Sequence, residues 1–160
     1  LFKKELNVDE STPSLIEKRN KIYIDIVNKE LQPMSGLIQM LDELDNLGIL
    51  TACATGAPRT LLELQLKKIG VFDRFMVKIS SDEISFGKPN PEIFNKAIER
   101  LGFNSSECAV VEDSIRGLIA AKKSGALTIA FPNHIPKEIE LPEYDFLITS
   151  LLEIPAIVMK

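Results

Sequence analysis

Short apolar runs alternate with amphipathic, helix-length segments from Ile49 to the end of the chain. The apolar runs that predict strands are 49–54, 76–79, 108–111, 127–131 and 145–148. The segments that predict helices are 58–69, 91–101 and 114–124, with a short helix beginning near Ser150. Glycine follows each of the three longer helices, as is usual at helix ends. This alternation predicts right-handed βαβ units, and therefore a doubly wound α/β fold whose parallel sheet is covered on both faces.

The segment before Pro33 has a different pattern. Residues 14–31 place apolar side chains along one stripe of a helix, and a second helix, 36–47, leads into the first strand. Pro33 separates these two helices. We therefore expect two domains, a helical segment over residues 1–33 and an α/β core over residues 34–160.

Charge and cysteine content exclude several classes of protein. The net charge of −4 disfavours a nucleic-acid partner, because neutralising phosphates requires a concentrated basic surface. We expect no membrane partner, because every apolar run is much shorter than the roughly 20 residues of a membrane span. Cys53 and Cys108 both lie in apolar runs. Two free thiols in a reducing compartment are therefore favoured over a disulfide or a metal site, and a cytoplasmic location is expected.

Ligands of parallel α/β sheets collect at the carboxyl ends of the strands, so the residues that follow the strands are candidates for a site. Thr55 follows the first strand, and its hydroxyl, with the amides of Gly56 and Ala57, could bind a phosphate oxygen. The alternative for Thr55 is a helix cap. Lys88 lies in a loop stiffened by prolines, and its ammonium suits a phosphoryl oxygen beside a carboxylate. The alternative for Lys88 is an exposed loop lysine.

Glu112 and Asp113 follow the predicted strand 108–111. Two adjacent carboxylates at a strand end are costly to remove from water unless a positive charge lies near them. Mg²⁺ is a natural partner, because proteins usually hold it with one or two carboxylates together with waters and a phosphate. The alternative is that Asp113 or Ser114 caps the next helix.

The ordered set of a strand-end Thr, the run GKPNPEIF and the run VVEDSIRGLIAAKKSGA resembles the second, third and fourth motifs of the haloacid dehalogenase (HAD) superfamily. These two sequence runs are especially similar to those of its β-phosphoglucomutase-like and phosphoglycolate-phosphatase-like group, and the resemblance extends from about Ser14 to Ser150. It implies an HAD-like Rossmannoid core with part of a helical cap at residues 1–33.

The resemblance also implies roles for individual residues. Thr55 would bind the transferring phosphoryl group, and Lys88 would bridge this group and the carboxylates. Asp113 would ligate Mg²⁺, with Glu112 as a second ligand or its close support. Gly56 would lie in the phosphate site, at a place where many relatives carry Ser or Asn.

Within the cap segment, Lys18, Arg19 and Asn20, followed by Tyr23, are similar to a cap-helix pattern of the β-phosphoglucomutase-like group. The resemblance makes Arg19 the candidate for a contact with the distal part of the substrate. A solvated charge on the helix surface is the alternative for Arg19.

The family's nucleophile is an aspartate in an Asp-x-Asp pattern after the first strand, and no strand in this sequence is followed by that pattern. We expect the nucleophile to lie outside this sequence, in a longer enzyme whose N-terminal segment is missing here or in a second polypeptide; a noncatalytic relative is the remaining possibility. In the family the missing strand is central in the sheet. Its absence would leave unpaired strand edges and favour a dimer partner or a completing segment.

These features together predict a Mg²⁺-dependent phosphohydrolase that acts on a small phosphorylated metabolite through an aspartyl phosphate. The 160-residue chain by itself is expected to be inactive. The alternatives are a hexose-phosphate mutase of the β-phosphoglucomutase type and a noncatalytic phosphate-binding relative or fragment.

Overall fold

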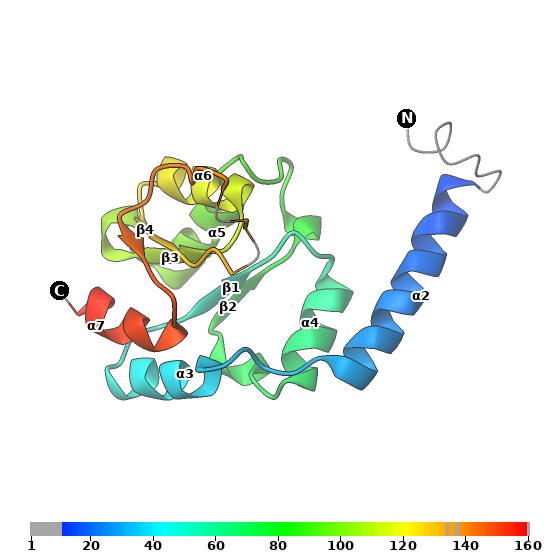
Figure 1. Cartoon of the computed structure of the whole chain (residues 1–160), viewed down its shortest axis with the longest axis horizontal. Coiled ribbons are helices and arrows are strands. Elements are labelled where there is room, and N and C mark those ends of the chain that lie inside the picture. The colour runs from blue at the N-terminus through cyan, green and yellow to red at the C-terminus, as the bar shows by residue number, and fades with distance from the viewer. Residues whose placement is uncertain (1–10, 134, 137, 160) are drawn as a thin grey trace. The chain divides into compact units, whose positions relative to one another are not determined.

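A computed structural model describes residues 11–133, 135–136 and 138–159. The chain divides into two compact units, Leu1–Gln32 and Pro33–Lys160. The described part of the first unit is dominated by a single helix, α2 (Thr12–Glu30), which contains most of the predicted helix 14–31 (Figure 1). The Ser11 side chain caps α2 by accepting a hydrogen bond from the Ser14 amide, and a proline lies in its first turn.

The second unit alternates strands and helices in the predicted order. Its elements are α3 (Leu37–Asn46), β1 (Ala52–Ala54), α4 (Arg59–Lys68), η1 (Phe72–Arg74), β2 (Val77–Ile79), η2 (Ser81–Glu83), α5 (Glu92–Leu101), η3 (Ser105–Glu107), β3 (Ala109–Glu112), α6 (Ile115–Ser124), β4 (Leu127–Ala130), β5 (Phe146–Leu147), η4 (Leu151–Glu153) and α7 (Ile154–Val158). Gly102 and Gly125, with φ of 82° and 80°, end α5 and α6 in a left-handed conformation that favours glycine.

All described strand pairs are parallel. β1 pairs with β2, and β3, β4 and β5 form a second sheet in that order. The strands thus form two sheets rather than the single sheet that the alternation predicted. Among the described residues, β1 and β3 each have a partner strand on one side only, so each leaves one edge unpaired. Val111 of β3 is 37% exposed, an unusual exposure for an apolar residue in the strand of a doubly wound fold.

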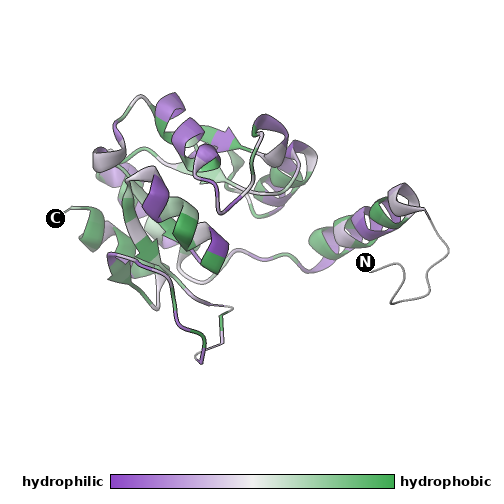
Figure 2. Cartoon of the chain, turned by 90° about the horizontal axis from the view of Figure 1, so that it is seen from above, coloured by the Kyte–Doolittle hydropathy of each residue, from purple (hydrophilic) through white to green (hydrophobic). Residues whose placement is uncertain are grey.

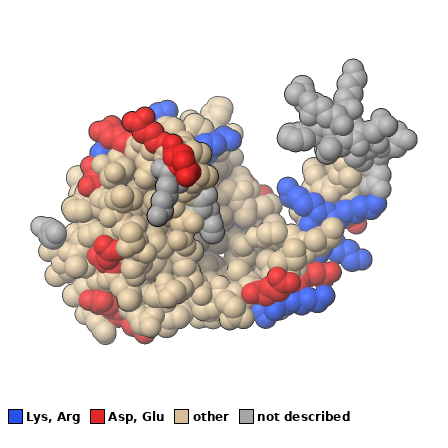
Figure 3. Space-filling view, viewed as in Figure 1, with Lys and Arg blue, Asp and Glu red and all other residues tan. Residues whose placement is uncertain are grey.

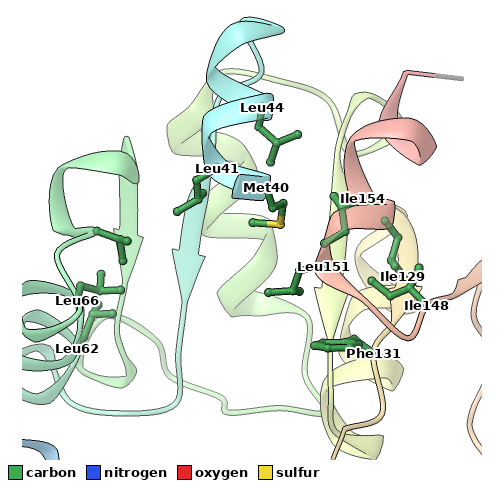
Figure 4. Close-up of a cluster of buried hydrophobic side chains, with 11 residues drawn as sticks. Met40, Leu41, Leu44, Leu62, Leu66, Ile129, Phe131, Ile148, Leu151 and Ile154 are labelled. Carbon is green, nitrogen blue, oxygen red and sulfur yellow. The ribbon is translucent and has the colours of Figure 1, made fainter. Parts of the chain in front are cut away.

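Helices cover both faces of these strands. One buried cluster gathers side chains of α3, α4, β4, η4 and α7, as Figure 4 shows; it comprises Met40, Leu41, Leu44, Leu62, Leu66, Val71, Ile129, Phe131, Ile148, Leu151 and Ile154. A second cluster packs α5 and α6 against the other face, where Ala52 and Ala54 of β1 point. Cys53, between these two alanines, packs against the first cluster, as the alternation of strand side chains requires. The predicted doubly wound α/β class is confirmed.

The distribution of polar and apolar residues along the described helices agrees with this layered arrangement. The helices show bands of polar and apolar residues, the pattern of amphipathic helices with one buried face (Figure 2). On the face drawn in Figure 3, acidic side chains are interspersed with Lys and Arg. None of the described helices combines the length and the apolar character needed to cross a bilayer.

Candidate functional site

An ion pair joins two of the predicted site residues. Lys88, in the loop between β2 and α5, directs its ammonium at the Glu112 carboxylate at the end of β3. Glu112 is 7% exposed and the Lys88 side chain 20% exposed. The cost of burying the Glu112 charge is therefore offset by Lys88, the positive partner that the two adjacent carboxylates required.

Glu112 is held from its other side by the start of α6. The Ser114 hydroxyl donates to Glu112 Oε2 at 3.1 Å and accepts from the Gly117 amide at 3.1 Å, so Ser114 is also the N-cap of the helix. A Cβ atom at Gly117 would lie 1.9 Å from Glu112 Oε2 and 2.1 Å from its Cδ. The carboxylate thus occupies the space that any other residue at position 117 would fill.

The loop that carries Lys88 is fixed by Glu92. The Glu92 carboxylate accepts hydrogen bonds from the amides of Ser85, at 3.0 Å, and Phe86, at 2.8 Å. These two bonds lower the pKa of Glu92 below its ordinary value. The Lys88 ammonium also lies 4.7 Å from the ring centre of Phe94 in α5, within cation–π distance. Lys88 is therefore oriented by its loop, by an aromatic ring and by Glu112.

Thr55 lies directly after β1, where its amide donates to the Ile79 carbonyl of β2 at 3.0 Å. Its hydroxyl oxygen accepts from the Ala57 amide at 3.2 Å. Because that bond uses a lone pair, the hydroxyl proton stays available to a ligand oxygen. Thr55 is not the cap of the following helix, because the residue before α4 is Pro58. Gly56 is exposed beside Thr55, with open space where a side chain would project.

The two adjacent carboxylates have different surroundings. Glu112 is buried and each of its oxygens is engaged by a partner, whereas Asp113 is exposed. The described residues contain no cluster of three or more His, Cys, Asp or Glu side chains that could hold a metal. Mg²⁺ accepts a single protein carboxylate when waters and a phosphate complete its shell, so Asp113 fits the chemistry of such an ion while Glu112 fits a supporting position.

The positive charge of Lys88 acts on a residue of each sheet. Burial raises the pKa of the Cys53 thiol, and the positive charges of Lys88 and Lys78 act in the opposite direction. Cys53 belongs to β1 and Glu112 to β3, so the Lys88 ammonium lies within electrostatic reach of one strand from each sheet. Neither Cys53 nor Cys108 is in a disulfide, as predicted.

The structure therefore brings Lys88 and Glu112 into contact and places Thr55 and Asp113 after β1 and β3, one strand from each of the two sheets. Arg19 belongs to the first unit, on α2, where its guanidinium is exposed and donates to the Asn20 side-chain oxygen at 2.7 Å. Two contacts of the site were not foreseen, namely the Phe94 ring and the space left by Gly117. Phe94 carried no signal beyond helical periodicity, whereas Gly117 was visible in the run VVEDSIRG.

A parallel α/β core with a buried lysine–carboxylate pair, a free carboxylate and a hydroxyl at its strand ends defines a class of domains suited to phosphoryl groups. A family model of haloacid dehalogenase-like hydrolases matches residues 2–125. The chain belongs to this family.

Individual relatives agree with this assignment. YhcW of Bacillus subtilis, whose name marks it as a presumed phosphatase, is 31% identical over 150 residues, which cover 94% of this chain and 66% of YhcW. CbbY of Rhodobacter sphaeroides, solved with phosphate, superposes with a TM-score of 0.82 at 22% identity, covering 92% of this chain and 67% of CbbY. A presumed β-phosphoglucomutase of Thermotoga maritima gives a TM-score of 0.79 at 21% identity, covering 98% of this chain and 74% of that one. The chain thus spans about two thirds of YhcW and CbbY.

Proposed function

We propose that the whole protein hydrolyses a small phosphorylated metabolite with the help of Mg²⁺, through an aspartyl phosphate formed on a residue outside this sequence. The observation that carries the proposal is the Lys88–Glu112 pair, buried at the carboxyl end of β3 beside the exposed carboxylate of Asp113. Charge-stabilising groups fixed before the reaction begins are the main requirement of phosphoryl transfer.

Three residues are proposed to act on the phosphoryl group, two by direct contact and one through Lys88. The Thr55 hydroxyl donates its free proton to one phosphoryl oxygen. The Lys88 ammonium, held by Glu112, offers its remaining N–H groups to a second oxygen and balances the charge that the nucleophile brings. Glu112 acts through Lys88 and keeps the ammonium from turning toward solvent.

Asp113 is the residue of this chain that would hold Mg²⁺, because its carboxylate is exposed and that of Glu112 is engaged. When bound, the ion neutralises phosphoryl charge during the in-line displacement. Gly56, with no side chain, leaves room for the phosphate to approach the backbone after β1. Arg19 of the first unit is the proposed contact for the distal part of the metabolite.

The nucleophile is proposed to follow a strand that lies between β1 and β3. Support comes from the unpaired edges of these two strands among the described residues, and from Lys88, which acts electrostatically on Cys53 of β1 and pairs with Glu112 of β3. A strand in that position would direct the residue at its carboxyl end toward the Lys88 ammonium. The 160-residue chain without it is proposed to be inactive.

Hydrolysis of p-nitrophenyl phosphate by the full-length protein with Mg²⁺ tests the proposal. We expect Asp113→Asn to lower kcat/KM by roughly 100-fold or more, because metal positioning is lost. Asp73→Asn is the matched control, since Asp73 is an exposed aspartate of η1, which precedes the amino end of β2, whereas Asp113 follows the carboxyl end of β3. Turnover that is independent of Mg²⁺ and of Asp113 would refute the proposal.

The name of YhcW, as a presumed phosphatase, favours hydrolysis over a mutase reaction, because the likeness to the β-phosphoglucomutase shows the fold alone. Incubation of the full-length protein with β-glucose 1-phosphate separates the two functions. Release of inorganic phosphate supports the hydrolase, and conversion to glucose 6-phosphate supports the mutase. Phosphate binding without either reaction would identify a noncatalytic relative.

A further inference from the structure

The helix that follows Thr55 has no cap of its own. α4 begins at Arg59, and the preceding residue, Pro58, has no side-chain acceptor for the free amides of the first turn. The Arg59 amide instead donates to Asp82 Oδ2 at 2.7 Å, although Asp82 is 23 residues away in the sequence. Asp82 lies in η2, directly after β2. A distant carboxylate therefore caps this helix and complements its positive end.

The Asp82 bond is one of three that join the two loops. The Thr55 amide donates to the Ile79 carbonyl at 3.0 Å, and the Ser81 amide donates to the Ala57 carbonyl at 3.0 Å. Residues 55–59 and 79–82 are therefore bonded at their beginning, middle and end. Only the Asp82 bond uses a side chain, so it can be removed by substitution while the backbone bonds remain.

The segment that carries Asp82 is held in place by hydrogen bonds and an ion pair. Ser80 is fully buried, and its amide and hydroxyl donate to Glu83 Oε1 at 3.0 and 3.2 Å. Glu83 in turn pairs with Arg100 of α5 at 2.5 Å. The Arg59 guanidinium, on the helix that Asp82 caps, donates to the Lys78 carbonyl of β2 at 3.0 Å. Asp82 thus projects from a segment that is tied to β2, α4 and α5.

We propose that Asp82 is a positioning residue for phosphate, which holds the Thr55 loop so that the free hydroxyl proton of Thr55 points at a phosphoryl oxygen. The inference rests on the proposed role of Thr55 and assigns a function to a residue that follows the edge strand β2. Asp82 acts as a hydrogen-bond acceptor. Its negative charge by itself opposes the binding of an anion nearby, so its two properties have opposite effects on phosphate affinity.

Because the hydrogen bond and the negative charge of Asp82 have opposite effects on phosphate affinity, two substitutions at this position can separate them. The Kd of inorganic phosphate for the full-length protein with Mg²⁺ is measured by calorimetry for the wild type, Asp82→Asn and Asp82→Ala, with Asp73→Ala as control. Asparagine keeps an acceptor oxygen and removes the charge, whereas alanine removes both. We expect Asp82→Ala to weaken binding roughly fivefold, the equivalent of a lost helix cap, and Asp82→Asn to bind at least as tightly as wild type.

A Thr55→Val background shows whether Asp82 acts through Thr55. We expect Asp82→Ala to weaken phosphate binding further by less than about twofold there, since coupled residues are non-additive. Equal effects in both backgrounds, or tighter binding by both Asp82 variants, would overturn the inference, and so would a wild type that binds no phosphate. Phosphate binding with the expected pattern but no hydrolysis would support the role of Asp82 while refuting the proposed hydrolase.

Discussion

Replacement of Gly117 by alanine provides the sharpest test of the site geometry. In most helices this change is favourable by about 1 kcal/mol, because alanine has the higher helix propensity. Gly117 lies within α6 and no positive φ requires glycine there. A Cβ atom at this position, however, would lie 1.9 Å from Glu112 Oε2, 2.1 Å from Cδ and 2.6 Å from Oε1. Contacts this short force the carboxylate out of its place.

The cost follows from what the displaced carboxylate loses. Glu112 would leave the Lys88 ammonium and the Ser114 hydroxyl, and breaking a buried ion pair costs about 3–5 kcal/mol. The Lys88 side chain is 20% exposed, which favours the lower end of this range. After the gain in helix propensity is subtracted, we expect Gly117→Ala to lower the free energy of unfolding by about 2 kcal/mol.

Urea denaturation followed by circular dichroism measures this change. Lys123 is an exposed residue of α6, so the difference between Lys123→Gly and Lys123→Ala gives the propensity term at an open site of the same helix. Glu112→Ala in the Gly117→Ala background removes the clashing group, and the double variant should be less destabilised than the sum of the single variants. A Gly117→Ala protein as stable as wild type, or strict additivity in the double variant, would refute the reasoning.

Two further predictions concern titrating groups. The amides of Ser85 and Phe86 lower the pKa of Glu92 below its ordinary value of 4.5. The stabilisation that the ionised Glu92 gives to the Lys88 loop is therefore fully present above pH 4.5 and is lost as the pH falls through the lowered pKa. The amide chemical shifts of Ser85 and Phe86 should therefore change only below pH 4.5 and show no such transition in Glu92→Gln. Burial raises the pKa of Cys53, so iodoacetamide should modify it more slowly at pH 8 than a free thiol, measured in a Cys108→Ser background. Lys78→Met should slow this reaction further, since the Lys78 charge lowers that pKa; a faster reaction would contradict the assignment.

Local signals in the sequence were sufficient for the helices and less so for the strands. The helix predicted over 114–124 is observed as Ile115–Ser124, because Ser114 and Gly125 cap its two ends. The strand predicted over 49–54 is observed only as Ala52–Ala54. An apolar run does not show where a partner strand begins, and Val77 pairs with Ala52 and not with an earlier residue. The division into two sheets depends on strand partners, which no periodicity specifies.

The candidate site, too, was predictable from the sequence only in part. Thr55, Lys88 and Asp113 could be chosen from their places after strands, because parallel strands collect ligands at one edge. The bond between Asp82 and Arg59 could not, because it joins residues 23 positions apart through the packing of β2 against β1. The Phe94 ring beneath Lys88 has the same origin in tertiary packing. Motifs therefore indicated the residues proposed to contact phosphate, and the structure was needed to find those that hold them in place.

The different surroundings of Glu112 and Asp113 explain why adjacent carboxylates need not share a function. Consecutive residues of an extended strand point in opposite directions. Glu112 ends β3 and is buried against Lys88 and α6, whereas Asp113, one residue further, is exposed. A cation that bound both equally would have to draw Glu112 away from the Lys88 ammonium and the Ser114 hydroxyl. The pair therefore consists of one carboxylate that fixes a lysine and one exposed carboxylate that is proposed to bind a metal, and the Gly117→Ala and Asp113→Asn variants separate the two roles.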